Sequence, residues 1–438
     1  MNQTSAPVRL GPINLSPGIT RGNGVALILS GLFVGILAPF INFAQPYILT
    51  EHLGIPKGEQ GTASGDLAFL TEVVLISLSG LMGAWSDKSG RRIVFAFGLA
   101  VVAVSYVLYP MADSLGELLI YRVVYAVGMA AVGAMFVAVQ AEYPADDSRG
   151  KLVGAMGVIS ILGVMFVVAV LAPLPARFIA GGATPVEAGI NAFWITAGIS
   201  LLGALALWVG LARKQTGKET HESILQKFTT GMTAARDNPR IALAYAAGFI
   251  GRADLVVVAV FLSLWITQAG RAQGMTTEEA LVQAGIMFGV LQLAALVFAP
   301  VMGYLTDRIS RVASLALACG LALVGYTWMG LLDTPMGPSA YPAAIVLGMG
   351  QVGAILAATA LVGQEVPKRL TGSVSGAFTI FGAIGILLST KVGGWLFDTW
   401  MPGAPFIMTG VANGLIMLAA FALIAAGHGR PAAEAAEG

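Results

Sequence analysis

Five charged side chains lie inside long apolar stretches of this sequence, where polar chemistry is otherwise rare. They are Glu72, Arg122, Arg252, Asp254 and Lys391. A charge near the centre of a membrane helix costs about 2.5–3.5 kcal/mol on insertion scales, so five cost on the order of 12–17 kcal/mol before any pairing. Residues placed at such a cost bind polar solutes, carry protons, or hold helices together as ion pairs.

Depth along the chain indicates which of these charges can meet. Glu72 and Arg122 lie about 10–12 Å below the outer surface at 1.5 Å per residue, so we expect them to pair across two spans. Arg252 and Asp254 are two residues apart on one helix and therefore point in different directions. The long side chain of Lys391 can instead reach outward to the lipid headgroups.

Proton coupling is the chemistry that two buried carboxylates suggest. Burial raises the pKa of a carboxyl group and a nearby arginine lowers it, so a change of pairing can load or release a proton. We therefore expect Glu72 and Asp254 to carry protons, with Arg122 as their switch partner or as the anchor for a solute. The alternative, that these charges form structural ion pairs, stays open.

Composition limits the class of protein that surrounds these charges. Charged residues make up 11% of the chain and hydrophobic residues 57%, whereas soluble domains average roughly 25% charged. A net charge of +1 gives nucleic acid binding no electrostatic support. One cysteine, Cys319, and three histidines in connecting or tail segments leave no expected disulfide, metal site or cofactor. Without a nucleophile–base set or a nucleotide-binding loop, we do not expect an enzyme.

Twelve apolar runs are long enough to cross a bilayer, which takes about 20 residues per helix. They cover residues 24–49, 64–85, 93–112, 115–141, 150–172, 190–212, 240–267, 281–304, 311–331, 340–364, 371–397 and 404–427. A polar connection, residues 213–239, separates two halves at 1–212 and 240–438. Apolar residues recur at helical spacing in this connection, which fits a short helix in the headgroup layer or an ordinary linker. These residues are Ile224, Leu225, Phe228 and Met232.

Lysine and arginine indicate which ends of the spans face the cytoplasm. Connections after even-numbered spans hold fifteen of these residues, whereas those after odd-numbered spans hold Lys57, Arg177 and Arg271. The positive-inside rule therefore places the even-numbered connections and both termini in the cytoplasm. The first 23 residues are polar and lack the apolar core of a signal peptide, so the first span must direct insertion. We expect a multi-pass protein of a bacterial inner membrane.

Two pairs of similar turns relate the halves. Residues 83–92 (GAWSDKSGRR) and 303–311 (GYLTDRISR) follow the second and eighth spans. Residues 142–154 and 365–376 each begin Glu-x-Pro and follow the fourth and tenth spans. Because every copy follows an even-numbered span, both halves have the same orientation. The sequence predicts an all-α integral membrane protein of twelve transmembrane helices in two parallel six-helix repeats.

The first of these turns resembles the signature loop of the major facilitator superfamily, Gly-x-x-x-Asp-x-x-Gly-Arg-Arg/Lys. The matching residues are Gly83, Asp87, Gly90, Arg91 and Arg92. Residues 303–311 resemble its degenerate second copy, with Ser310 in place of a glycine. The resemblance covers essentially the whole chain. It implies a monomeric secondary transporter that moves a small solute by alternating access.

The resemblance also implies two cytoplasmic charge networks that close in one state and break in the other. The first consists of Asp87, Arg91, Glu142 and Arg149, and the second of Asp307, Arg311, Glu365 and Arg369. By the same resemblance, the glycines allow helices to approach closely at the turn. The aspartate caps the next helix or pairs with an arginine across the half. The alternative is that these charges only enforce topology and solubility.

The solute is less well defined by the sequence. By the resemblance, spans 3, 6, 9 and 12 face lipid, and none has a charge in its interior. The five buried charges then line a central cavity, and their sum of +1 favours an amphipathic or anionic organic compound held by Arg122 or Arg252. Four amides occupy plausible cavity positions, namely Asn42, Gln45, Gln292 and Gln351.

Two other functions remain open. Residues 122–128 resemble the superfamily's span-4 motif linked to proton coupling, Arg-x-x-Gln-Gly-x-Gly, but Tyr125 and Ala126 depart from it. A proton-coupled multidrug efflux antiporter is one alternative, although the fifth span lacks the Gly-Pro pair typical of that group. A membrane sensor built on the transporter fold is an alternative from another class.

Overall fold

The computed structural model describes residues 8–213, 224–365 and 370–428, and these are almost entirely helical. Twelve helical segments among them are long and apolar enough to cross a membrane. Each corresponds to one predicted span, so the prediction of a twelve-helix integral membrane protein is confirmed. Most ends differ by a few residues. The second span, for example, was expected at 64–85 and is Gln60–Ser89.

Capping explains why two spans begin earlier than their apolar residues do. The sixth span starts at Pro185 because Thr184 accepts a hydrogen bond from the N–H of Glu187, whose side chain bonds back to Thr184. The eighth starts at Thr277 through the same capping box between Thr276 and Glu279. A capping box satisfies two backbone groups at a helix start, so polar residues join the helix ahead of the apolar run.

The chain divides into two compact units. The first holds the described residues of Met1–Gly54 and Leu70–Glu219, and the second those of Ile55–Phe69 and Thr220–Gly438. Elements of the first unit are β1 (Arg9–Leu10), β2 (Ile13–Asn14), α1 (Arg21–Tyr47), α3 (Arg91–Leu108), α4 (Leu115–Glu142), α5 (Arg149–Phe166), α6 (Leu174–Ala180) and α7 (Pro185–Gly210). Helix α2 (Gln60–Ser89) begins in the second unit and ends in the first.

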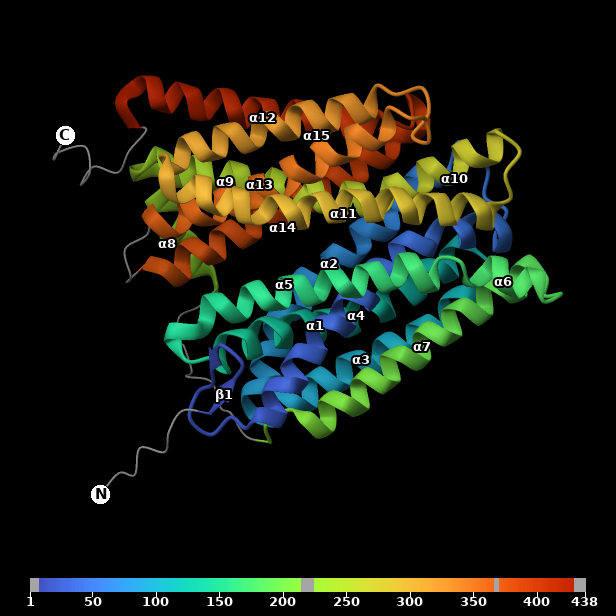
Figure 1. The fold of residues 1–438 in the computed structure, drawn as a ribbon, viewed down its shortest axis with the longest axis horizontal. Coiled ribbons are helices and arrows are strands. Elements are labelled where there is room, and N and C mark those ends of the chain that lie inside the picture. The colour runs from blue at the N-terminus through green and yellow to red at the C-terminus, as the bar shows by residue number, and fades with distance from the viewer. Residues whose placement is uncertain (1–7, 214–223, 366–369, 429–438) are drawn as a thin grey trace. The chain divides into compact units, whose positions relative to one another are not determined.

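The second unit contains the remaining helices (Figure 1). They are α8 (Ile224–Asp237), α9 (Pro239–Val257), α10 (Ser263–Ala272), α11 (Thr277–Arg308), α12 (Arg311–Gly330), α13 (Ala340–Glu365), α14 (Thr371–Thr399) and α15 (Ala404–Leu423). One π-helical turn joins α9 to α10 into a single span, and another, followed by two turn residues, joins α5 to α6 in the first unit. Each unit therefore supplies six membrane-spanning segments. The first unit reaches six by including α2, whose first residues belong to the second unit.

Glycine allows neighbouring helices to approach at backbone distance. A Cβ on Gly35 of α1 would collide with the carbonyl oxygen of Ser160 on α5, and one on Gly163 would lie 2.6 Å from that of Leu32. In the second unit, a Cβ on Gly385 of α14 would collide with the carbonyl oxygen of Phe249 on α9. Small residues at such crossings are typical of membrane helices, which associate through close packing.

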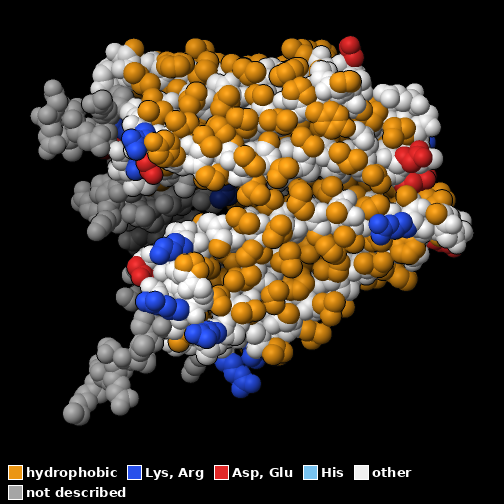
Figure 2. Space-filling view, in the orientation of Figure 1, with side chains coloured by type: hydrophobic (Ala, Val, Ile, Leu, Met, Phe, Trp, Pro, Cys, Tyr) orange, Lys and Arg blue, Asp and Glu red, His pale blue; other side chains and the backbone are white. Residues whose placement is uncertain are grey.

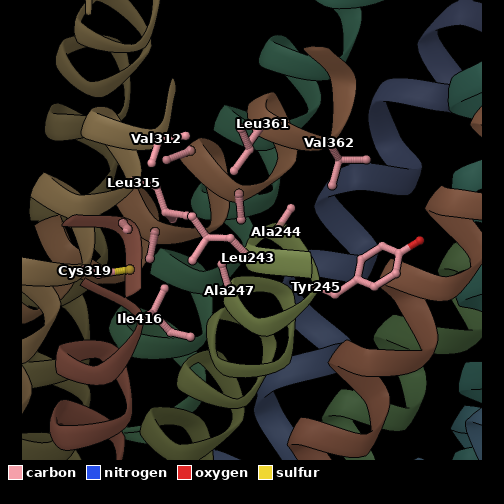
Figure 3. Packing of buried hydrophobic residues seen from close by; sticks show 14 of the residues in the cluster. Leu243, Ala244, Tyr245, Ala247, Val312, Leu315, Cys319, Leu361, Val362 and Ile416 are labelled. Carbon is pink, nitrogen blue, oxygen red and sulfur yellow. The ribbon is translucent and has the colours of Figure 1, made fainter. Parts of the chain in front are cut away.

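A dense apolar cluster joins helices of the second unit near one of their ends. It joins α9, α12, α13 and α15, and Figure 3 shows Leu243, Leu315, Leu361 and Ile416 among its members. Cys319 lies in the same cluster, 1% exposed, and behaves there as a small apolar side chain. The outer surface is also apolar: in Figure 2, hydrophobic side chains cover the visible middle of the helices and charged ones gather near their ends.

Of the two possibilities for the connection between the halves, a helix is present, namely α8. It packs closely against α14. A Cβ added to Gly231 would lie only 2.7 Å from the carbonyl oxygen of Ser373. The Tyr245 hydroxyl of α9 donates a hydrogen bond of 3.1 Å to the carbonyl of Gly231. Its position in the headgroup layer stays a prediction.

Candidate functional site

Arg122, on α4, is the most deeply buried cation of the first unit, with 1% of its surface exposed. Its Nε donates a hydrogen bond of 2.8 Å to Thr71 Oγ1 on α2, and its Nη2 donates to Asn42 Oδ1 on α1. The guanidinium carbon lies 5.2 Å from the centre of the Tyr125 ring. The remaining nitrogen, Nη1, is buried without a hydrogen-bond partner among the described residues. Three helices thus hold this cation while one donor nitrogen stays unused.

Aromatic side chains surround this arginine. Tyr125 donates a hydrogen bond of 3.1 Å to the carbonyl of Ala38 on α1. Tyr109 donates one of 3.2 Å to the side chain of Gln45, which is 1% exposed. Tyr125 stands where the superfamily motif has glutamine, and the ring–cation contact gives that departure a use, since an aromatic face attracts a guanidinium. Asn42 contacts Arg122 directly, whereas Gln45 lies one turn further along α1 and bonds to Tyr109.

Glu72 directly follows Thr71 on α2 and is half-buried. Because Thr71 contacts Arg122, Glu72 lies at about the same level along the helices as Arg122. The pairing of Glu72 with Arg122 stays a prediction.

Asp254, on α9, is fully buried and its carboxylate accepts hydrogen bonds of 3.1 and 3.2 Å from the amide of Asn413 on α15. No ion pair involves this carboxylate in the described part of the chain. Its backbone carbonyl accepts bonds from Gln351 of α13 and Tyr326 of α12. Gln351 therefore supports the α9 backbone and does not touch the carboxylate.

Asp254 and Arg252 take different directions, as their spacing predicts. The resemblance placed all five charges on helices that line a central cavity, and this carboxylate bonds to Asn413 of the twelfth span. Helix geometry gives the reason, since two residues along a helix turn the side chain by about 200°. Arg252, two positions earlier, takes the other direction and packs on α14, where a Cβ on Gly382 would collide with it.

Arg252 is half-buried, and its guanidinium has no ion pair or hydrogen bond within the described ranges. It is separate from Asp254, as expected from their spacing. An unpaired cation within a span is costly unless water or a ligand reaches it. The second unit thus holds a free cation and a carboxylate with a neutral partner on opposite sides of α9.

A cavity of about 160 Å³ borders Asp254 between α9, α14 and α15. Its lining is mostly apolar, with Ser389 and Thr409 as the hydroxyl groups. A water molecule needs only about 10–15 Å³ of such volume. The cavity therefore has room for water beside the carboxyl group.

The ammonium of Lys391 forms an ion pair with Asp66 in the first part of α2. The same two helices are joined at the start of α2, where Asp398 accepts hydrogen bonds of 2.9 and 2.6 Å from the N–H groups of Gly61 and Thr62. A carboxylate satisfies the free donors of a helix start and its positive dipole end. Lys391 is therefore part of a helix contact, which weakens its role as a solute anchor.

The first signature turn gathers three charges. Arg91 Nη1 lies 2.6 Å from Asp87 Oδ1, and Arg91 Nη2 lies 2.7 Å from Glu142 Oε1 at the end of α4. Arg149, the fourth expected member, is exposed and donates a bond of 3.3 Å to the carbonyl of Ala141. Arg92 points elsewhere, with its guanidinium 4.7 Å from the ring of Trp208. Asp87, Arg91 and Glu142 thus form a cluster in which Arg91 contacts both carboxylates.

The second expected set is not brought together in the same way. Asp307 is exposed, and Arg311 donates a bond of 2.9 Å to the carbonyl of Ala360. Glu365 instead lies 3.0 Å from Arg240, which the sequence had not selected. Arg369 lies outside the described residues. Among the described residues, the two copies therefore differ in their pairings. The degenerate copy has Ser310, which caps α12 by accepting a hydrogen bond from the N–H of Ala313.

The glycines of the signature turns have different roles from the expected one. A Cβ on Gly83 or Gly303 would meet nothing within 4 Å, so neither marks a close helix approach within the described residues. Gly90 has φ +94° between α2 and α3, a conformation that side chains with a Cβ avoid. The turn therefore needs Gly90 for its backbone angle.

Several contacting residues escaped the sequence reasoning. Asp66 lay inside its predicted span, 64–85, and could have been counted with the five charges. Asn413 is the one asparagine of the last span, and a lone amide in an apolar helix indicates a buried partner. The contacts of Thr71 and Arg240 had no comparable signal. Among the described residues, no group of three or more His, Cys, Asp or Glu side chains is arranged to hold a metal ion.

Twelve spans in two like-oriented halves, with a charged signature turn after the second, define a multi-pass membrane transporter. The family model described as Major Facilitator Superfamily matches residues 25–390, and the chain belongs to this family. Solved structures agree in fold: the nucleoside transporter NupG covers 91% of this chain and 98% of its own, with a TM-score of 0.71 at 14% identity. Family and fold identify a transporter and not an enzyme.

Three relatives are more similar to this chain in sequence than NupG is. Magnetosome protein MamH of Paramagnetospirillum magneticum is 29% identical over 413 residues, covering 92% of each chain. MamZ of the same organism is 28% identical over 93% of this chain, which spans 63% of MamZ. The class G tetracycline resistance protein of Vibrio anguillarum is 27% identical over 86% of this chain and 94% of its own.

Proposed function

We propose that this transporter moves a small organic anion across the membrane, coupled to protons, by alternating access. One observation carries the proposal, namely the unused donor of Arg122. Nε and Nη2 are fixed by Thr71 and Asn42, so the guanidinium is oriented before any solute arrives. Nη1 remains buried without a hydrogen-bond partner among the described residues, and a carboxylate or similar oxygen would satisfy it.

The cations inside the membrane spans favour an anionic solute. Each unit has an arginine inside a membrane span, Arg122 in the first and Arg252 in the second. Of these two, only Arg122 is fixed by hydrogen bonds among the described residues. Tyr109 and Tyr125 give the Arg122 site an aromatic wall with polar edges. A site of this kind fits an amphipathic compound that presents an acidic group to the guanidinium and a flat apolar part to the rings.

Proton coupling is assigned to Asp254 and Glu72. Acidic residues inside membrane spans commonly mark proton pathways. Asp254 supports this role because its carboxylate has the neutral amide of Asn413 as partner and borders a cavity with room for water. Glu72 follows the residue that binds Arg122, so a proton on Glu72 would alter the charge next to the solute site.

Efflux of hydrophobic compounds is the second candidate function. It is favoured by the similarity to the class G tetracycline resistance protein over 86% of this chain. It is disfavoured by the absence of the Gly-Pro pair in the fifth span. The solute class that the protein binds distinguishes the two candidates.

A ligand screen tests the proposal directly. Purified protein in detergent is heated in the presence of organic anions, organic cations and neutral compounds, since a bound ligand raises the melting temperature by mass action. We expect anions to stabilise the wild-type protein and not the Arg122→Gln variant. Stabilisation by hydrophobic cations alone would support the efflux candidate. Stabilisation by a solute that never crosses proteoliposome membranes would indicate a sensor.

The cluster of Asp87, Arg91 and Glu142 is proposed to close the transporter in one state and separate in the other. Replacing Asp87 by asparagine removes the 2.6 Å ion pair with Arg91 but keeps a similar shape. We expect Asp87→Asn to fold and to bind solute normally, with turnover reduced about tenfold. Flux in proteoliposomes measures this, and a wild-type rate would contradict the role in closing.

The orientation follows from the positive-inside rule, with both termini and the signature turns in the cytoplasm. The relatives are bacterial, and a bacterial inner membrane is the proposed location, with the protein acting as a monomer. A carboxyl-terminal reporter that is active only in the cytoplasm checks the orientation, and an inactive fusion would reverse it.

A further inference from the structure

The residues before α1 fold into a small hairpin on the first unit. Strands β1 and β2 pair antiparallel around a turn in which Gly11 has φ +57°. Ile13, Leu15 and Ile19 are at most 5% exposed. Leu15 packs on Gly24 of α1, where a Cβ would lie 3.2 Å from its side chain.

This hairpin binds the turn between α4 and α5. The backbone of Ser16 donates a hydrogen bond of 2.9 Å to the carbonyl of Tyr143, and Ala145 donates one of 2.9 Å back to the carbonyl of Asn14. Asn14 also bonds through its N–H to Ser148 Oγ at 3.0 Å.

Two side-chain bonds complete the contact. Asn14 Nδ2 donates to Asp147 at 2.7 Å, and Ser16 Oγ donates to the carbonyl of Pro144 at 2.9 Å. Five hydrogen bonds therefore fix a turn of six residues, Tyr143 to Ser148.

The fixed turn begins at the residue after Glu142. Glu142 is the acceptor for Arg91, through Nη2 at 2.7 Å and Nε at 3.1 Å. An arginine bonds a carboxylate through two nitrogens only when the carboxylate is held in a matching position. The Tyr143 hydroxyl is also fixed from another side, by the N–H of Ala212 at 3.0 Å. Anything that loosens the turn would therefore displace Glu142 from Arg91.

The second unit has a counterpart at the same place in its own repeat. Asn238, which immediately precedes α9, donates a hydrogen bond of 3.0 Å to Glu365 at the end of α13. Arg240, in the first turn of α9, forms the ion pair with the same glutamate. In each half, the residues that lead into the first helix thus hold the end of the fourth. The hairpin is the larger version of a feature that both halves share.

We propose that the amino-terminal hairpin is a brace that positions Glu142 for Arg91. Asn14 and Ser16 act as positioning residues, since they touch the turn and not the charge cluster. This inference deepens the closing role proposed for that cluster. It does not depend on which solute is carried.

A double-mutant cycle tests the brace. Glu142→Gln is made in the full chain and in a chain lacking residues 2–16, and the loss of melting temperature is measured in each. If the hairpin positions Glu142, the substitution should cost the shortened chain less than half of what it costs the full chain, because the contact is already weakened. Equal losses in both chains would overturn the proposal. No solute is needed, so this result stands even if the proposed transport fails.

Matched variants exclude a general loss of folding. Deleting residues 2–7 keeps the hairpin and should behave as the full chain does. The double variant Asn14→Ala/Ser16→Ala keeps the buried Ile13 and Leu15 but removes both side-chain bonds, and it should reproduce part of the effect. In flux assays, the deletion of 2–16 should lower turnover about fivefold with KM unchanged. It should add nothing to Glu142→Gln, and a further additive loss would assign the hairpin a merely structural role.

Discussion

Replacing Arg122 by glutamine should reduce transport at least about 100-fold while the protein stays folded. Glutamine can keep one of the bonds to Thr71 and Asn42, but it removes the charge and the unused donor. Arg122→Lys should recover little, because an ammonium cannot reproduce the planar fork that spans two acceptors. Uptake of the solute found in the ligand screen, measured in proteoliposomes, gives both rates.

The control for this variant is Arg177→Gln, which removes an exposed arginine on α6. It should transport at the wild-type rate. If Arg122→Gln also does, then Arg122 is a structural residue and the anion site must be sought at Arg252. Melting temperature is recorded for both variants, since the loss of a buried cation also affects folding.

Replacing Asp254 by asparagine should separate transport from the proton gradient. Asparagine can still bond to Asn413, so the contact between α9 and α15 remains. It cannot take up or release a proton. We expect the variant to exchange solute down its gradient but not to accumulate it when a pH difference is imposed, as followed by radiolabelled solute in proteoliposomes. Glu72→Gln is expected to give the same phenotype.

The matched control is Asp66→Asn, an acid of the same second unit that is paired with Lys391. It should retain accumulation driven by the pH difference. If Asp254→Asn and Glu72→Gln both retain it as well, the assignment of coupling to these carboxyl groups is wrong. Loss of accumulation in all three variants would point to a general effect on the membrane seal.

The spans could be predicted from the sequence because their signal is local. A helix in a bilayer satisfies its own backbone and exposes its side chains to lipid, so a long apolar run is sufficient evidence. The errors lie at the ends, where polar residues cap the helix, as Thr184 and Thr276 do. The hairpin at residues 9–14 was not foreseen, because two strands of two residues leave almost no periodic pattern.

The candidate site was harder to predict, as three charges show. The sequence found Arg122, Asp254 and Lys391 from their cost in the membrane. It did not find that they bond to Thr71, Asn413 and Asp66. These partners lie from 51 to 325 residues away in the chain. Such contacts depend on how each helix is rotated, and a rotation of one residue, about 100°, changes the partner.

By itself, the sequence determined that this protein has twelve membrane helices, that its halves repeat with one orientation, and that it is a transporter of the major facilitator type. Each conclusion rests on composition, spacing or a short motif, which are properties of neighbouring residues. Only the tertiary structure decided that Arg122 keeps an unused donor, that Asp254 turns toward Asn413, and that a hairpin holds the turn beside Glu142. The physical reason is that burial without a partner, and fixation by several distant bonds, exist only after the helices have packed.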